Sequence, residues 1–263
     1  MSFFTFLTET DDQYKDLDID TQVVCDKGPL TSAYLINNTA LTDISIPYIS
    51  AAYSGAVDLN ISIDRGATTS WNQIMVINHT FPASGTFTIA SGTTSAVSNN
   101  SDTMSWREFD VYFRTASTRT HRYIRITLHD PVTASHSISI GRIMIGLATT
   151  LTSNFNYDWE LARKVLNKTT LSETNTRSTN RIVEYKELVL TFEEMTDAQL
   201  LSLTTFTDAL HGDAVYAFIV PDPQFYNGYL MHLTSEVREI HNRRHRLPPL
   251  TFTEVSRGVR NAS

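Results

Sequence analysis

The sequence has one cysteine and little charge, and both scarcities narrow what the protein can be. Cys25 is the only cysteine among 263 residues, so no disulfide can form within the chain. A lone cysteine is more typical of a small buried side chain than of a nucleophile. Charged residues make up 19% and apolar residues 41% of the chain, a balance typical of a globular fold. A chain of this length buries a complete apolar core, so the fold needs neither disulfide nor metal.

Long apolar runs are missing as well. No stretch approaches the roughly 18 apolar residues of a membrane-spanning helix, so we expect no membrane span. The opening segment MSFFTFLTETDD has no basic start and turns acidic after about eight residues, unlike a secretion signal. We therefore expect synthesis in a cytoplasm, without export.

Sequence signatures of catalysis are also absent. The chain has no glycine-rich phosphate loop, no GxSxG turn around a nucleophilic serine and no HExxH zinc motif. His241 and His245 lie four residues apart, but zinc needs at least a third ligand and three arginines crowd this segment. Acidic pairs such as Asp158 and Glu160 act as a glycosidase pair only at a defined separation in space. We therefore predict no enzyme activity, no metal and no cofactor.

Residues 20–147 contain short alternating segments separated by turn-forming residues. AVDLNISID, REFDVYFRT and RYIRITLHD each place apolar side chains at every second position, which is the pattern of a half-buried strand. Seven or eight such strands, with turns roughly 8–12 residues apart, are typical of an antiparallel sandwich. Residues 90–105 are polar and rich in Gly, Ser and Asn, which predicts a loop.

The second half changes character and contains the one strong helix signal. Thr196 and Gln199 match a capping box, and Gly212 supplies a stop. The apolar residues between them recur at helical spacing, namely Leu200, Leu203, Phe206 and Leu210. This pattern predicts a helix over 197–210. Upstream, DWELARKVLNKT suits either a short helix or an extended arm, and LSETNTRSTNR is loop-like.

The fold predicted from these patterns is mostly β. We expect an N-terminal acidic arm over 1–20 and an antiparallel jelly-roll sandwich over 21–147. A smaller β domain with one flanking helix would then occupy 148–263.

Charge is laid out unevenly along the chain. Residues 9–20 hold six acidic residues against one lysine, and residues 238–260 hold six arginines against two glutamates. Opposite charge near the two ends suits like subunits that pack head to tail, although two solvated surfaces explain it equally well. A net charge of −7 argues against nucleic-acid binding. The candidate subunit-contact residues are Asp11, Asp12, Asp16, Arg238, Arg243, Arg244 and Arg246.

Two tryptophans are candidate glycan contacts. Trp71 and Trp106 both lie at strand starts beside polar loops, where ligand-binding aromatic residues often occur. Core or rim packing is the alternative explanation.

The strand patterns also carry a resemblance to known families. RYIRITLHD followed by SISIGRIMIG resembles the galactose-binding-like (discoidin-type) sandwich, over roughly Thr21–Leu147. The segments AFIVPDPQFYNGYLMHLTSEVREI and LPPLTFTEVSRG resemble the C-terminal parts of bacteriophage tail-tip and distal-tail proteins.

The resemblance implies a structural role in a phage tail. The expected function is a distal-tail or tail-tip subunit that forms a homo-oligomeric ring, with the tube, tape measure, hub or fibre as neighbours. The expected location is the virion, after synthesis in the bacterial cytoplasm. The alternative is a carbohydrate-binding module for a host-surface glycan. Other virion roles, such as a head–tail or capsid-decorating protein, come third, and a hydrolase has no positive support in the sequence.

Overall fold

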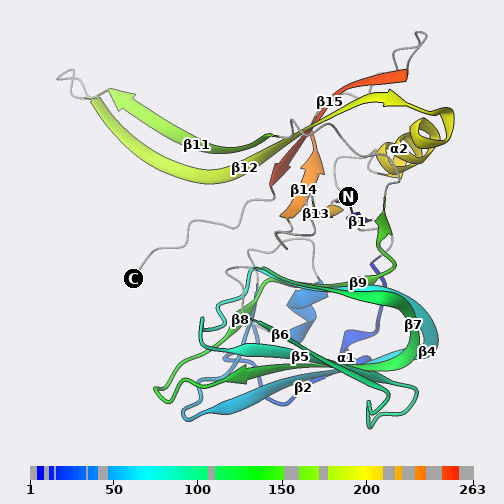
Figure 1. Cartoon of the computed structure of the whole chain (residues 1–263). Coiled ribbons are helices and arrows are strands. Elements are labelled where there is room, and N and C mark those ends of the chain that lie inside the picture. Colours follow the sequence, from blue (N-terminus) through cyan, green and yellow to red (C-terminus); the bar gives the residue numbers. More distant parts are fainter. Residues whose placement is uncertain are drawn as a thin grey trace. The chain divides into compact units, whose positions relative to one another are not determined.

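The computed structural model divides the chain into two compact units. One unit is Asp11–Ala148, and the other combines Met1–Thr10 with Thr149–Ser263. The chain is mostly β with antiparallel sheets, as predicted (Figure 1). The structure describes residues 5–8, 12–14, 16–33, 35–40, 47–105, 110–150, 160–171, 177–209, 217–220, 229–234 and 245–254.

The predicted acidic arm over 1–20 is not a separate segment. β1 (Thr5–Thr8) is a strand of the second unit, where it pairs with β13 (Ala217–Val220) and β10 (Thr149–Thr150). Asp12 and Tyr14 are instead buried in the Asp11–Ala148 unit. The acidic residues lie beside apolar residues that pair or pack, with Phe6 and Leu7 before them and Tyr14 among them.

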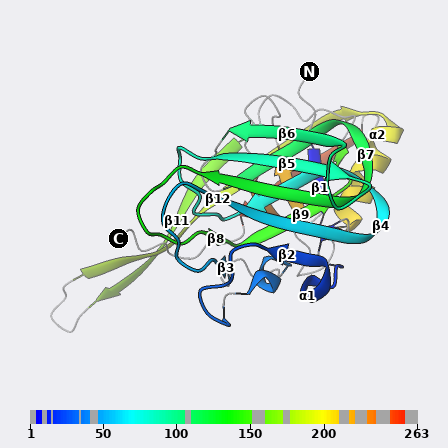
Figure 2. The same cartoon turned by 90° about the horizontal axis from the view of Figure 1, so that it is seen from below.

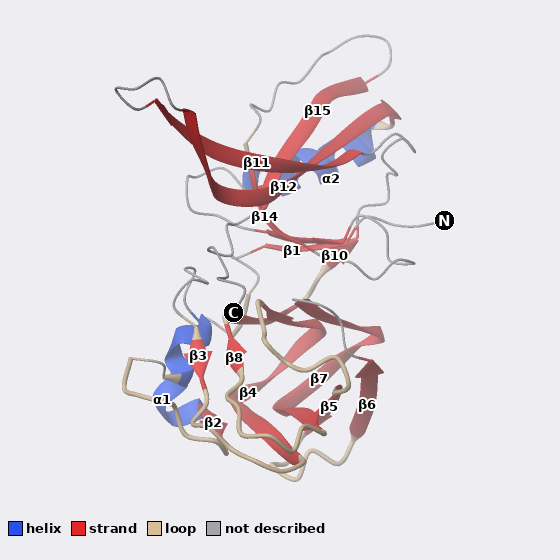
Figure 3. Ribbon diagram, turned by 90° about the vertical axis from the view of Figure 1, so that its left-hand side faces the viewer, coloured by secondary structure: helices blue, strands red, loops and turns tan. Residues whose placement is uncertain are grey.

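The Asp11–Ala148 unit is an antiparallel sandwich. Its largest sheet has the order β2-β4-β7-β5-β6, β9 pairs with the second half of β4, and β3 pairs with β8. Figure 2 shows the strands of this unit, and Figure 3 shows α1 (Ile19–Gln22) next to β2. The other bounds are β2 Val23–Cys25, η2 Ile36–Ala40, β3 Tyr48–Ile49, β4 Val57–Ile77, β5 Thr86–Gly92, β6 Asn100–Ser105, β7 Asp110–Asp130, β8 Ser139–Ile140 and β9 Arg142–Gly146.

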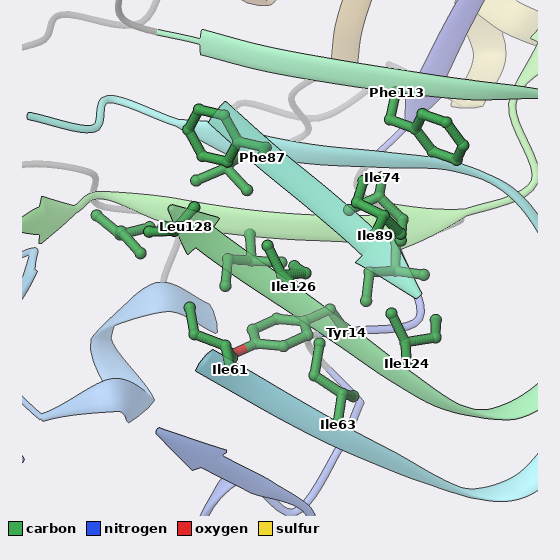
Figure 4. Close-up of a cluster of buried hydrophobic side chains, with 14 of the residues drawn as sticks. Tyr14, Ile61, Ile63, Ile74, Phe87, Ile89, Phe113, Ile124, Ile126 and Leu128 are labelled. Carbon is green, nitrogen blue, oxygen red and sulfur yellow. The ribbon is translucent and has the colours of Figure 1, made fainter. Parts of the chain in front are cut away.

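The core of this unit follows the predicted alternation. Ile124, Ile126 and Leu128 of β7 are buried and face the buried side chains of β4 and β5, as Figure 4 shows. The registers Ile61↔Ile126 and Ile126↔Ile89 place these residues opposite one another across three strands. Strand pairs of β-branched residues pack well on a pleated surface, so the outward positions are left for polar chemistry.

β4 and β7 are each 21 residues long and bend together through two compensating irregularities. At the first irregularity the extra residues are in β4. Residues 65–68 lie between Asp64 and Thr69, whereas in β7 only Arg122 lies between their partners Tyr123 and His121. At the second irregularity the extra residues are in β7. Residues 115–118 lie between Arg114 and Arg119, whereas in β4 only Asn72 lies between their partners Gln73 and Trp71. The sequence had suggested two separate strands here, because RTASTRT reads as a turn.

The second unit is a seven-stranded sheet in the order β10-β1-β13-β14-β15-β12-β11. Its helix α2 (Asp197–Ala209) coincides with the predicted helix up to Ala209, and Leu203 is fully buried. Residues 210–216 lie outside the described part. The remaining bounds are β11 Glu160–Leu171, β12 Arg177–Met195, β14 Tyr229–Leu233 and β15 His245–Glu254.

Two local predictions are wrong. Residues 90–105 are not a single loop, because Asn100–Ser105 forms β6 and pairs with β5. The segment LSETNTRSTNR is not a loop throughout, because β12 begins at Arg177. Of the two alternatives for DWELARKVLNKT, the structure shows the extended one, since Glu160–Leu171 is the strand β11. Among the described residues, no helix is both long and apolar enough to cross a membrane.

Candidate ligand-binding site

A polar pocket opens where β7 loops out of its ladder with β4. Its volume is about 520 Å³, within the roughly 300–1,000 Å³ typical of ligand pockets. The bulged residues Thr115, Ser117 and Thr118 form part of its lining. Bulges are common next to binding sites because they turn side chains out of the regular pleat. The full lining is Asn100, Asp102, Phe113, Thr115, Ser117, Thr118, Arg119, Thr120 and His121.

The bulge is fixed by its own hydrogen bonds. The Thr115 hydroxyl is buried and donates to the Ser117 carbonyl, with a second acceptor in the Asn72 carbonyl. Ser117, Thr118 and Thr120 are exposed. The bulge therefore presents exposed hydroxyl groups, which donate and accept hydrogen bonds equally well.

Arg119 is the best-fixed polar side chain of the pocket. Its Nη2 lies 2.6 Å from Asp102 Oδ2, across from β7 to β6. The guanidinium carbon lies 5.5 Å from the centroid of the Trp71 ring and 5.5 Å from that of Phe113, so two aromatic faces hold the cation. The Arg119 side chain is 14% exposed and that of Asp102 is 37% exposed. The carboxylate is therefore the more accessible partner.

His121 lines the pocket, and a second arginine, Arg65, bonds to the backbone of His121. His121 Nδ1 lies 2.9 Å from Ser91 Oγ, and burial together with the charge of Arg119 lowers the pKa of His121, which favours the neutral ring. Arg65 is buried and donates to the carbonyls of Thr69 and His121. Burial lowers the pKa of Arg65 to about 10, so it still carries its charge near neutral pH.

The chemistry of the pocket suits binding. A carboxylate, a guanidinium, hydroxyls and the side-chain amide of Asn100 lie around one cavity. Among the described residues of its lining, Asp102 is the single carboxylate, whereas glycosidases use two carboxylates at a set separation. The described residues likewise contain no group of three or more His, Cys, Asp or Glu side chains arranged to hold a metal.

Of the two candidate glycan contacts, the structure describes Trp71. Trp71 is fully buried beneath Arg119, so its ring offers no surface for a sugar. Of the two alternatives for Trp71, the structure shows core packing and not a glycan contact. Trp71 lies opposite Arg119 in the register, next to the half-buried Ser70 and Asn72, and begins the half of β4 in which residues 73–77 are all buried. Trp106 lies outside the described residues.

One candidate subunit contact is also corrected. Asp12 is buried and bonded to Arg142 within the sandwich, so it faces no neighbouring subunit. Asp16 is exposed, as a contact residue must be. Arg246 lies in β15, and its side chain is not described. The other candidates lie outside the described residues, namely Asp11, Arg238, Arg243 and Arg244.

Arg119, Asp102 and His121 were not predicted from the sequence. Asp102 lies in the segment read as a loop, and the two β7 residues lie at the supposed turn between two strands. The one available signal is the polar insertion TASTRTH between two alternating apolar runs. Such an insertion within a continuous strand indicates a bulge.

Sequence comparison identifies no relatives. No protein-family model matches the chain, and no curated protein matches it. Among solved structures, a chitosan-binding module from a chitosanase/glucanase of Paenibacillus sp. IK-5 has a TM-score of 0.36 and 13% identity, covering 47% of this chain and 92% of that one. A GH29 fucosidase of Ruminococcus gnavus in complex with fucose has a TM-score of 0.39 and 16% identity, covering 48% of this chain and 25% of that one.

Proposed function

We propose that the Asp11–Ala148 unit binds a saccharide in the pocket beside β6 and β7. The observation that carries this proposal is the Arg119–Asp102 pair. The guanidinium is held between two aromatic rings, and the carboxylate beside it is 37% exposed in a pocket lined by hydroxyls. A donor and an acceptor fixed side by side match the vicinal hydroxyls of a sugar, each of which both donates and accepts.

Preorganisation favours binding at this pocket. Arg119 loses little side-chain freedom when a ligand arrives, because the two rings and Asp102 already define its position. Hydrogen bonds to ionised groups are stronger than those between neutral groups. The bulge adds hydroxyls on a backbone that the Thr115 hydroxyl fixes through its hydrogen bond to the Ser117 carbonyl.

The test combines a glycan array with a matched pair of variants. The full chain is applied to the array, and the affinity for the best saccharide is then measured by calorimetry. Asp102→Asn keeps the size of the side chain but removes the charged acceptor, and should weaken binding by about tenfold or more. The control is Asp58→Asn, which removes an exposed carboxylate from β4 of the same unit.

Two outcomes would contradict the proposal. A chain that binds no saccharide on the array lacks the function altogether. Equal affinities for Asp102→Asn and Asp58→Asn would show that a bound saccharide lies elsewhere. Thermal unfolding of each variant checks that the fold is intact.

A structural subunit of a phage tail is the second candidate function, and one observation favours a subunit role. β11 and β12 pair with each other from Arg163↔Lys186 to Leu171↔Arg177, and β15 joins β12 only from Glu187 onward. Over that stretch neither strand pairs with another described strand (Figure 1). A two-stranded ribbon is marginally stable by itself, so contact with another subunit would stabilise it.

Charge gives this ribbon a direction of assembly. Residues 163–186 carry net +4, while the whole chain carries −7, so the ribbon attracts the remainder of a second copy. The positive residues are Arg163, Lys164, Lys168, Arg177, Arg181 and Lys186, against Glu173 and Glu184.

Sedimentation velocity at low and high salt tests the subunit role, with electron microscopy of any assembly for closed rings. Since Lys164 and Tyr185 are register partners, a two-residue Asn-Gly turn can join them and remove the ribbon. The intact chain should assemble and the shortened chain should not. A monomer under every condition, without a partner recovered from virions, counts against a tail subunit.

A further inference from the structure

A second hollow lies on the Asp11–Ala148 unit, away from the bulge of β7. It is a groove of about 230 Å³ between β2, β4, β7 and the loop that follows β5. Val24, Ser62, Val97, Tyr123 and Arg125 are among its lining residues. The groove is smaller than the roughly 300–1,000 Å³ of typical ligand pockets, so it suits a single ring-sized group.

Arg125 lines this groove, and the hydrogen bonds of its guanidinium are long. Its closest contacts are 3.4 Å from Nε to Ser62 Oγ and 3.5 Å from Nη2 to the Ser95 carbonyl, both near the outer limit of a hydrogen bond. No carboxylate of the described residues pairs with it. Arg122, which precedes it in β7, instead donates two hydrogen bonds to Asp64, at 2.6 and 2.7 Å. Asp64 also lines the groove, but its charge is neutralised by Arg122, so the charge of Arg125 is left for a ligand.

The walls beside Arg125 are apolar or aromatic. Val24 is 62% exposed, which makes it one of the most exposed large apolar side chains described. The Tyr123 ring is held by the Arg122 guanidinium carbon at 5.0 Å from its centroid. A ring bound in the groove would thus contact apolar surface while its polar substituent reaches Arg125.

The loop that closes the groove is held in a strained conformation. Val97 has φ of +48°, which costs energy for a β-branched residue. Its amide donates to the Thr94 carbonyl at 3.0 Å. Gly92 permits the close approach, because a Cβ there would lie 2.9 Å from Val97 Cα. Strain of this kind persists at binding sites, where it fixes a wall in place.

We infer that this groove is a second binding site, for a carboxylate-bearing sugar ring such as a uronic acid. The guanidinium of Arg125 can donate two parallel hydrogen bonds to a carboxylate. The apolar faces of the ring would pack on Tyr123 and Val24. The site is separate from the Arg119 pocket, so it stands whether or not that pocket binds a saccharide.

The test is a titration of the isotope-labelled full chain by NMR with three probes. D-glucuronate carries the carboxylate on a ring, D-glucose is the neutral ring, and acetate is the carboxylate alone. Glucuronate should shift the Arg125 Nε–Hε signal saturably, and glucose and acetate should bind at least about tenfold more weakly. Arg125→Gln should weaken glucuronate by about tenfold or more, with Arg125→Lys in between. The control Arg163→Gln removes the same charge from β11 of the other unit.

Three results would overturn the inference. One is the absence of a saturable shift with glucuronate. A second is equal weakening by Arg125→Gln and Arg163→Gln, which would indicate attraction to overall charge. The third is equal binding of glucose and glucuronate, which would exclude the carboxylate as the recognised group. Arg125 has only two long contacts, so Arg125→Gln should keep the wild-type melting temperature, and a collapsed spectrum would move the test to Arg125→Lys alone.

Discussion

Replacing Asp12 with Asn should lower the free energy of unfolding, and the loss should be larger at acid pH than at neutral pH. Asp12 and Arg142 both have side chains with 0% exposure, and their nearest atoms are 3.3 Å apart. Asp12 Oδ1 also accepts from the amides of Tyr14 and Ile145, each at 3.0 Å. These bonds attach the start of the unit to β9. Asn keeps one oxygen for the two amides but turns an NH2 group toward Arg142, so a donor faces a donor. Losing one partner of a buried hydrogen bond typically costs about 1–3 kcal/mol, so Asp12→Asn should destabilise the unit.

Burial sets the sign of the pH dependence. It raises the pKa of Asp12 from 3.8 to about 6, and the charge of Arg142 and the two amides only partly offset this. A pKa raised in the folded state means that the folded protein takes up the proton first, so Asp12 adds stability as pH falls from about 6 to 3.8. At 1.36 kcal/mol per pKa unit, the full gain is about 3 kcal/mol, and most of it is present by pH 4.

Denaturant unfolding followed by circular dichroism at pH 7.5 and pH 4 measures this effect. All other carboxylates titrate in both proteins, so their contribution cancels in the difference between wild type and Asp12→Asn. That difference should grow by about 2–3 kcal/mol on going to pH 4. A difference that shrinks at pH 4 would refute the reasoning, because it would mean that Arg142 dominates over burial and holds the carboxylate ionised.

Two further predictions concern stability and titration. Leu203→Ala should destabilise the second unit by about 2–5 kcal/mol, since Leu203 is fully buried; a change below about half a kcal/mol in denaturant unfolding would show that its face of α2 is not packed. His136 should titrate above 6.5 in NMR, because the Ala134 carbonyl and Asp130, 2.6 Å away, both favour the protonated ring. Asp130→Asn should lower that pKa. The stability that His136 contributes is present at acid pH and is lost as pH rises through its folded pKa, so the variant should lose part of it. An unchanged His136 titration in Asp130→Asn would contradict the role of Asp130.

Alternation made much of the sandwich predictable. In RYIRITLHD the apolar positions Ile124, Ile126 and Leu128 are all buried, because a strand's period of two leaves no other way to bury them together. The helix was equally clear, since its cap and its apolar spacing agree. Leu203, at the centre of that spacing, is indeed buried.

Edge strands were the part that the sequence could not reveal. β6 is NSDTMS and ends its sheet, so it has little apolar surface to bury and its composition resembles that of a loop. β11 is also an edge, and ELARKVLNKTTL has apolar residues at spacings that suit a helix or a strand. Pairing with the strand next to it in the chain decided both cases, β5 for β6 and β12 for β11, and composition alone does not show such pairing.

The candidate site depends on the arrangement of several strands in the sheet, and for this reason no sequence motif indicates it. Arg119 and Asp102 are 17 residues apart and meet only because β6 and β7 both flank β5 and β7 bulges beside Trp71. Without the bulge, every residue after Arg114 would shift its register against β4. Trp71 would then lose Arg119 as its partner. A tryptophan beside a polar loop suggests a ring on which a sugar stacks, yet the Trp71 ring packs against the guanidinium of Arg119. In the proposed site, Trp71 therefore acts on a ligand only through the position that it gives to Arg119.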